Sequence, residues 1–243
     1  MKHAFVLLPL LLFAAACRSQ PEPEQTIAAT APAAQTCELP ARLRPAGPET
    51  PPRDEIVADA QVAYHMLAVA WGPYWREVNR DGRGYPLTPQ DRDTGFFLHG
   101  LWPNAADGPH PRYCSVTPAR AMTPAEVGEH FCMTPSEKLL QHEWAAHGTC
   151  GWDDPDAYFD QAAELWSALT PPELPERTTA GAVRDAWTAA NPHIHRDGVY
   201  LATTEDGRLR EVRLCYDLAF APAACPRGLG APDHAPLRVQ PRR

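Results

Sequence analysis

FFLHGLWP, at residues 96–103, and HEWAAHGTC, at residues 142–150, are the two stretches of this sequence that decide its fold and its chemistry. The first stretch places His99 inside an apolar, aromatic run that is typical of a buried strand. Trp102 follows it and offers a stacking surface for a ring-shaped ligand. Taken alone, each residue has an ordinary structural role, since a single histidine or tryptophan in such a run is more often part of the core.

The second stretch fits a helix whose spacing excludes one common metal motif. Glu143 and His147 are four residues apart, which places them about 40° apart on one helical face. His142 is five residues from His147, about 140° around the helix, so the two histidines cannot hold zinc as an H-E-x-x-H motif does. What remains is a histidine beside a carboxylate, a pair suited to proton transfer at mildly acidic pH.

Local patterns elsewhere predict both strands and helices. Residues 64–71, YHMLAVAW, are typical of a buried strand. A threonine followed by proline and glutamate predicts helix starts at Thr123 and Thr134, and Asp154-Pro155 predicts a third. Further predicted elements are a helix at residues 180–190 and a hairpin of strands 199–203 and 209–218 around a D-G turn. The elements do not alternate regularly, which favours the α+β class.

Composition and charge narrow the class of protein. The chain has 243 residues, of which 44% are hydrophobic and 21% charged, as in one large globular domain or two small ones. Its formal net charge of −8 excludes the basic footprint of a duplex-DNA-binding protein.

The first 52 residues are predicted to lie outside the folded domain. Residues 1–16 combine a short basic start, an apolar run and three alanines, which is typical of a signal peptide. Cys17 follows as in a bacterial lipobox, which predicts a periplasmic or outer-membrane lipoprotein attached to the membrane through that lipid alone. The alternative is an ordinary cleaved signal peptide and a soluble periplasmic or secreted protein. Residues 17–52, with eight prolines, predict a tether, and residues 53–243 the catalytic domain.

Six cysteines remain when Cys17 is set aside: Cys37, Cys114, Cys132, Cys150, Cys215 and Cys225. In an exported chain they predict three disulfides, whose pairing the residues alone leave open. No two of them form a C-x-x-C pair, which argues against a structural zinc site.

The two histidine stretches resemble the signature motifs of the ribonuclease T2 family and occur in that family's order. FFLHGLWP matches the first motif throughout, and HEWAAHGTC matches the second except at Ala146, where the family usually has lysine. The likeness covers roughly residues 60–226. It implies an α+β, ribonuclease T2-like fold: a central antiparallel sheet with several helices, held by disulfides. The family's bridges would join Cys114 to Cys150 and Cys215 to Cys225; by subtraction, Cys37 would pair with Cys132.

The resemblance also implies a role for each residue at the site. His99 and His147 would be the acid–base pair, in which His147 takes the ribose 2′-OH proton and His99 protonates the leaving 5′-oxygen. The two would exchange roles when the 2′,3′-cyclic phosphate is hydrolysed. Glu143 would polarise the phosphate and orient His147, and His142 would bind phosphate. The positions that resemble the family's base-binding site are Trp102, Asn104 and His110.

This mechanism implies an RNA substrate and no DNA, because DNA lacks the attacking hydroxyl. It implies no metal and no other cofactor, and we expect a monomer. The net charge predicts weak non-specific affinity for RNA and an acidic optimum. Ala146 removes a positive charge near the phosphate, a loss expected to cost about 10²-fold in rate unless Arg112 or Lys138 replaces it.

Two other functions stay open. The chain could be an exported binding module that keeps the fold without catalysis, for which Ala146 and the negative charge are the arguments. It could also be a metallohydrolase using His193 and His195, although a histidine pair in a proline-flanked loop is usually solvated surface.

Overall fold

Strand β1 (Tyr64–Trp71) is one of the two inner strands of a four-stranded antiparallel sheet. All eight of its residues are buried, as its apolar run predicts. The sheet order is β2-β1-β5-β4, with β2 (Phe96–Asn104), β5 (Leu209–Tyr216) and β4 (Val199–Thr203). The predicted hairpin is therefore formed by β4 and β5, and Gly207 has the positive φ of 77° that its turn requires.

The computed structural model describes residue 1 and residues 37–82, 84–87, 94–115 and 117–242. The predicted signal peptide, Cys17 and the first part of the predicted tether lie outside the described residues. Within the described ranges, no helix is long and apolar enough to cross a membrane.

The segment of residues 37–52, which we call the N-terminal arm, belongs to the folded unit that begins at Cys37. A disulfide joins Cys37 to Cys132, and the hydroxyl of Tyr113 donates a 2.6 Å hydrogen bond to the carboxylate of Glu49. The sequence predicts a tether up to residue 52 because the arm has few bulky apolar side chains. The structure differs because a covalent bond, polar contacts and Leu43, which packs against the main apolar core, hold the arm.

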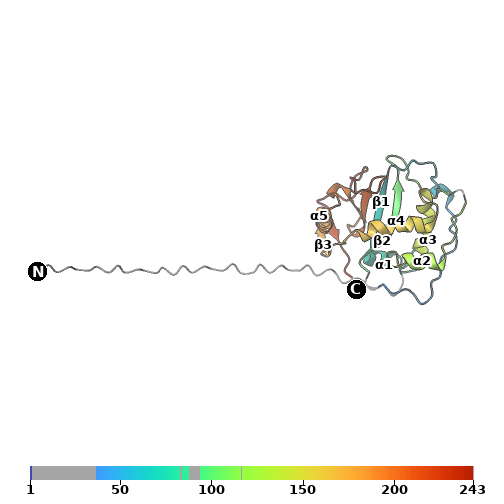
Figure 1. Cartoon of the computed structure of the whole chain (residues 1–243), viewed down its shortest axis with the longest axis horizontal. Helices are drawn as coiled ribbons and strands as arrows, with labels where there is room; N and C mark the ends of the chain where they lie inside the picture. The colour runs from blue at the N-terminus through green and yellow to red at the C-terminus, as the bar shows by residue number, and fades with distance from the viewer. Residues whose placement is uncertain (2–36, 83, 88–93, 116, 243) are drawn as a thin grey trace. The chain divides into compact units, whose positions relative to one another are not determined.

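Five α-helices surround the sheet in the part of the chain that the structure describes: α1 (Gly72–Val78), α2 (Pro124–His130), α3 (Glu137–Ala146), α4 (Pro155–Ser167) and α5 (Ala180–Ala190). Helix α4 crosses in front of the sheet in Figure 1 and contacts β1 and β2. The short elements are β3 (Arg177–Thr179) paired with β6 (Pro236–Arg238), and the 3-10 turns η1 (Arg53–Glu55), η3 (Gly148–Cys150) and η4 (Arg196–Gly198).

Side-chain caps confirm three of the predicted helix starts and correct one. Thr123 forms the capping box of α2, Asp154 caps α4, and α5 spans its predicted residues. Helix α3 begins at Glu137 with Ser136 as its N-cap, two residues later than the pattern at Thr134 predicts. The hydroxyl of Thr134 is buried and donates instead to the carbonyl of Leu98 at 2.8 Å. A contact with the neighbouring strand therefore takes the predicted cap residue.

The three disulfides pair as expected: Cys37–Cys132, Cys114–Cys150 and Cys215–Cys225. The second joins the segment after β2 to η3, directly behind His147. It therefore fixes the end of the HEWAAHGTC stretch against the domain.

A β-bulge in β2 gives the sheet its two different faces. Gly100 pairs with Ala68 and Leu98 pairs with Val69, so His99 is an extra residue in the strand. As a result Leu98 and Leu101, which lie three positions apart, both enter the main apolar core beneath α4. His99 turns the other way, where its ring lies 5.1 Å from that of Trp102 and 4.7 Å from that of Trp75. One face is thus the core, and the other carries the polar residues described below.

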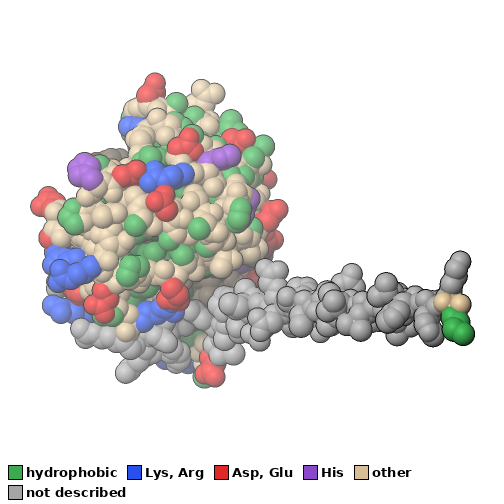
Figure 2. All heavy atoms as spheres, turned by 90° about the vertical axis from the view of Figure 1, so that its left-hand side faces the viewer, with side chains coloured by type: hydrophobic (Ala, Val, Ile, Leu, Met, Phe, Trp, Pro, Cys, Tyr) green, Lys and Arg blue, Asp and Glu red, His purple; other side chains and the backbone are tan. Residues whose placement is uncertain are grey.

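The distribution of charged side chains on the surface agrees with the negative net charge of the chain. On the face drawn in Figure 2, lysine and arginine side chains are interspersed with aspartate and glutamate rather than gathered into one broad basic track. This face therefore offers no continuous electrostatic groove for a long nucleic acid.

A buried arginine joins α5 to the segment after β5. Arg184 is fully buried and donates hydrogen bonds to the carbonyls of Val199 (3.0 Å), Leu229 (2.6 Å) and Ala231 (2.6 Å). Its guanidinium also pairs with the carboxylate of Asp233 at 2.5 Å. This one side chain therefore ties the backbone of β4 and of residues 229–231 to α5.

We predict that Arg184→Met lowers the free energy of unfolding by about 3 kcal/mol, because it removes three hydrogen bonds to backbone carbonyls and the buried ion pair with Asp233. Urea unfolding of the two proteins measures the difference. Arg177→Met, at an exposed position in β3, is the matched control and should unfold as the wild type does. Equal midpoints for the Arg184 variant and this control would show that the hydrogen bonds contribute nothing net.

Candidate active site

His99 is held between two carboxylates. The bulge directs its ring toward β5, where Nδ1 lies 2.7 Å from Oε1 of Glu211. Its Nε2 lies 3.2 Å from Oε1 of Glu143, on α3. The side chain is 14% exposed, whereas the two carboxylates are almost fully buried. The ring is therefore fixed in orientation but still accessible.

Glu143 is completely buried at the centre of this arrangement. Its second oxygen accepts a 2.8 Å hydrogen bond from Nε1 of Trp102. A Cβ at position 100 would lie 1.9 Å from that oxygen, so only glycine allows the carboxylate to approach β2. The glycine after His99 in FFLHGLWP is therefore required by the position of Glu143.

His147 is placed differently from the sequence-based prediction. Helix α3 ends at Ala146, and His147 is its C-cap residue, with φ −123° and ψ −43°. Its Nδ1 has no hydrogen-bond partner among the described residues, and its ring lies 5.3 Å from that of Trp102. Among the described residues no hydrogen bond or ion pair joins Glu143 to His147; the carboxylate contacts His99 and Trp102 and acts on His147 through its charge. Trp102 therefore touches both histidines.

His142 contacts residues that sequence reasoning did not link to it. Its Nδ1 lies 2.9 Å from the carboxylate of Glu49 in the N-terminal arm. Its ring centroid lies 4.7 Å from that of Tyr85, with the planes tilted by 35°, and its Nε2 lies 3.4 Å from a guanidinium nitrogen of Arg112. Arg112 in turn pairs with Glu55 at 3.0 Å. The arm and the turn after it thus place one carboxylate on His142 and another on Arg112.

A pocket of about 590 Å³ opens beside these groups. The predicted base-binding residues Trp102, Asn104 and His110 all line it, together with His147. The other lining residues are Tyr64, Met66, Pro103, Pro111, Arg112, Tyr200, Arg213, Arg227 and Gly228. His99, Glu143 and His142 lie outside this lining, so the structure brings the predicted residues together in two adjoining groups.

The base-binding candidates also have structural contacts. Asn104 is 3% exposed and donates to the carbonyl of Trp102 at 2.6 Å, and Nδ1 of His110 accepts from the backbone of Ala105 at 3.1 Å. The guanidinium of Arg213 covers the ring of Trp102 at 4.6 Å. The indole is therefore occupied by protein contacts before any ligand stacks on it.

Of the two candidates to replace the missing lysine, Arg112 reaches the site. It lines the pocket and lies beside His142. Lys138 instead donates to the carbonyl of Gly84 at 2.9 Å. Ala146 itself is fully buried in the main apolar core.

Burial and charge shift the two catalytic candidates in opposite directions. Burial alone would lower the pKa of His99, but the negative charges of Glu143 and Glu211 outweigh it and raise this pKa to about 9. Burial lowers the pKa of His147 to about 3, and Glu143 opposes this only in part. Burial opposes the ionisation of Glu143, yet its histidine neighbours lower its pKa to about 2. One histidine is thus held cationic and the other neutral around a single carboxylate.

Sequence comparison relates the chain to known ribonucleases. Residues 63–176 match the model of the Ribonuclease T2 family. A probable ribonuclease of Haemophilus influenzae is 31% identical over 180 residues, which cover 69% of this chain and 62% of that protein. A ribonuclease of Aeromonas hydrophila is 32% identical over 107 residues, which cover 42% of this chain and 44% of that protein. The matched region thus spans less than two thirds of either relative.

Solved structures show the same architecture. An RNase-related protein from Calystegia sepium has a TM-score of 0.57 at 18% identity, and the match covers 75% of this chain and 99% of that one. RNase NT in complex with 5′-AMP has a TM-score of 0.52 at 22% identity, with 73% and 100% covered. These likenesses confirm the ribonuclease T2-like fold that the two motifs predict.

We predict that Glu211→Gln lowers the pKa of His99 by about 1–3 units, because it removes one of two carboxylates that stabilise the imidazolium. NMR titration of the His99 ring measures this pKa in the wild type and in the variant. A raised pKa stabilises the fold fully below the unfolded value of about 6.5 and loses that effect as pH rises through the folded value. The wild type should therefore lose stability between pH ~6.5 and ~9, and the variant less. Arg210→Gln, on the exposed side of β5, is the control. If the pKa of His99 does not change in the Glu211 variant, then Glu143 alone raises that pKa.

Proposed function

The chain belongs to the ribonuclease T2 family, and from this premise we propose that it is an endoribonuclease that cleaves single-stranded RNA without a metal. RNA is first cleaved by transphosphorylation to a 2′,3′-cyclic phosphate, which is then hydrolysed to a 3′-phosphate end. The proposal rests on the opposite pKa shifts of His99 and His147, whose rings both lie against that of Trp102. Groups whose pKa values are pushed apart are suited to be acid and base in one reaction.

In the first step, the neutral His147 takes the proton of the ribose 2′-OH as its oxygen attacks phosphorus. The bond from phosphorus to the 5′-oxygen breaks, and the cationic His99 gives its proton to that leaving oxygen. The assignment follows from the pKa directions, since the base must begin neutral and the acid must begin protonated. Because the nucleophile belongs to the substrate, positioning and proton transfer supply the catalysis.

In the second step the roles exchange. His99, now neutral, takes a proton from water as the water oxygen attacks the cyclic phosphate. His147, now cationic, protonates the departing 2′-oxygen, and both histidines return to their starting states. Glu143 orients His99 and favours its protonated form. Its hydrogen bond from Trp102 also fixes the indole ring that lies beside His147.

The phosphate is proposed to bind at Arg112 and His142. Arg112 supplies a fixed positive charge at the pocket, which Ala146 does not. In this structure Glu55 and Glu49 pair with these groups. A substrate phosphate would therefore compete with two carboxylates, which fits the weak non-specific affinity expected from the net charge.

The base is proposed to enter the pocket beside Trp102, Asn104 and His110. RNase NT has been solved with 5′-AMP, which supports a nucleotide site in this fold. The three disulfides point to a protein outside the reducing cytoplasm. A lipid on Cys17, a periplasmic location and a monomeric state remain proposals from the sequence.

A binding module without catalysis is the alternative, favoured by Ala146 and by the carboxylate on His142. Such a protein would bind RNA fragments and leave RNA intact. The experiment below separates the two.

We predict that the purified chain cuts single-stranded RNA in the presence of EDTA, and that His99→Ala and His147→Ala each reduce the rate by about 10²–10⁴-fold. The products should carry 2′,3′-cyclic phosphate and then 3′-phosphate ends, as gel and mass analysis show. His195→Ala, at an exposed histidine, is the control. Cleavage that EDTA abolishes, or that both active-site variants retain, would contradict the mechanism.

We predict a broad pH profile in place of the acidic optimum expected from the net charge, because kcat/KM requires a neutral base and a protonated acid. The value of kcat/KM should fall only as pH drops toward the low pKa of His147 or rises toward the high pKa of His99. Glu211→Gln should move the alkaline limb to lower pH and leave the acidic limb in place. Movement of the acidic limb instead would reverse the assignment of acid and base.

A further inference from the structure

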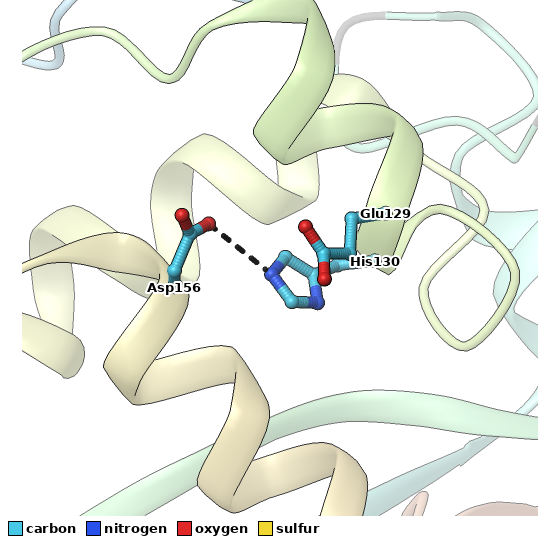
Figure 3. Close-up of side chains that lie close together, drawn as sticks. All are labelled: Glu129, His130 and Asp156. Carbon is cyan, nitrogen blue, oxygen red and sulfur yellow. Dashed lines mark ion pairs between the residues drawn. The ribbon is translucent and has the colours of Figure 1, made fainter.

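A second group of chemically active side chains lies where α2 ends and α4 begins. Glu129 and His130 are the last two residues of α2, and Asp156 lies in the first turn of α4. Each offers one oxygen or nitrogen atom, and these three atoms lie within 4.8 Å of one another. Figure 3 shows both carboxylates directed toward the imidazole of His130. None of these residues lines the pocket of the active site.

His130 is the residue that distinguishes this group from an ordinary acidic surface. It is 3% exposed, its ring stacks on Phe159 at 5.0 Å, and its Nε2 has no hydrogen-bond partner. That nitrogen points at Oδ1 of Asp156, 3.5 Å away, which is also buried without a hydrogen bond. Buried polar atoms are normally paired, so two facing atoms without a hydrogen bond call for an explanation. A cation bound between them would satisfy both.

We propose that Glu129, His130 and Asp156 form a binding site for a divalent transition-metal ion of the zinc type. One imidazole nitrogen and two carboxylate oxygens are ligands that Zn²⁺ accepts, and the imidazole disfavours Mg²⁺ and Ca²⁺, which prefer oxygen alone. Zinc holds such ligands at about 2.0–2.2 Å. The exposed side chain of Glu129 can move to close the remaining distance, and solvent completes the coordination.

The surrounding charges permit a cation here. A nearby cation is Arg120, whose charge acts on Asp154 and Asp156. Its guanidinium is paired with both oxygens of Glu126, which offsets its repulsion of a metal. Asp154 adds a further negative charge at the start of α4.

A bound metal would act as a brace between two helices. His130 stands two residues before Cys132, whose disulfide holds the N-terminal arm. The ion would therefore join α2 to α4 beside an existing covalent link. This role is separate from RNA cleavage, which is proposed to need no metal, so the two proposals can fail independently.

The test is titration of the full, EDTA-treated and dialysed chain with Zn²⁺, followed by calorimetry, and with Co²⁺, followed by its visible absorption. We expect one site that weakens about 10-fold or more in each of Glu129→Gln, His130→Gln and Asp156→Asn, since loss of a ligand should cost at least as much as loss of a supporting residue. Zn²⁺ should also raise the midpoint of thermal unfolding of the wild type but not of these variants. Asp160→Asn, at an exposed position of α4, is the control.

The metal titration can either support or overturn the proposed site. Binding that all three variants retain would assign the ion to other histidines and overturn the proposal, as would a wild type that binds no Zn²⁺. If His130→Gln does not fold, the two carboxylate variants decide. RNA cleavage in EDTA should be equal in the control and in the Glu129 and Asp156 variants, and this result does not depend on the metal titration.

Discussion

The buried carboxylate of Glu143 is the interaction on which the rest of the site depends. An ionised carboxylate without water is costly unless a positive charge and hydrogen bonds compensate it. His99 supplies the charge and Trp102 the hydrogen bond, and Gly100 leaves room for both. In the resting protein the ionised Glu143 holds His99 protonated, while the neutral state of His147 avoids a second buried charge. A requirement of folding thus sets the protonation states that the proposed chemistry uses.

The bulge at His99 makes this arrangement possible. In a regular strand, residues three positions apart point to opposite faces. His99 and Trp102 lie on the same face only because the extra residue reverses the alternation. The same reversal lets Leu98 and Leu101 both enter the core. One irregularity therefore serves packing on one side of the sheet and chemistry on the other, with Glu211 and Arg213 on β5 completing the polar face.

Most elements could be predicted from the sequence because their signals are local. The apolar run of β1, the capping box at Thr123 and the turn at Gly207 depend on neighbouring residues only. The start of α3 could not be predicted, because Thr134 bonds to Leu98 across the fold.

The same distinction applies to the site. The motifs predicted His99, Glu143 and His147 as a group, but not which histidine Glu143 contacts. Nothing in the local sequence marks Glu211 or Glu49, since each reaches its histidine only through tertiary structure. The N-terminal arm gives a practical example of a contact that the local sequence does not mark. A chain shortened to begin at residue 53, the boundary that composition favours, would lose Glu49 and leave Cys132 as a free thiol. The smallest unit that keeps both the disulfide and the Glu49–His142 contact therefore starts at Cys37. The border that composition favours falls within this folded unit.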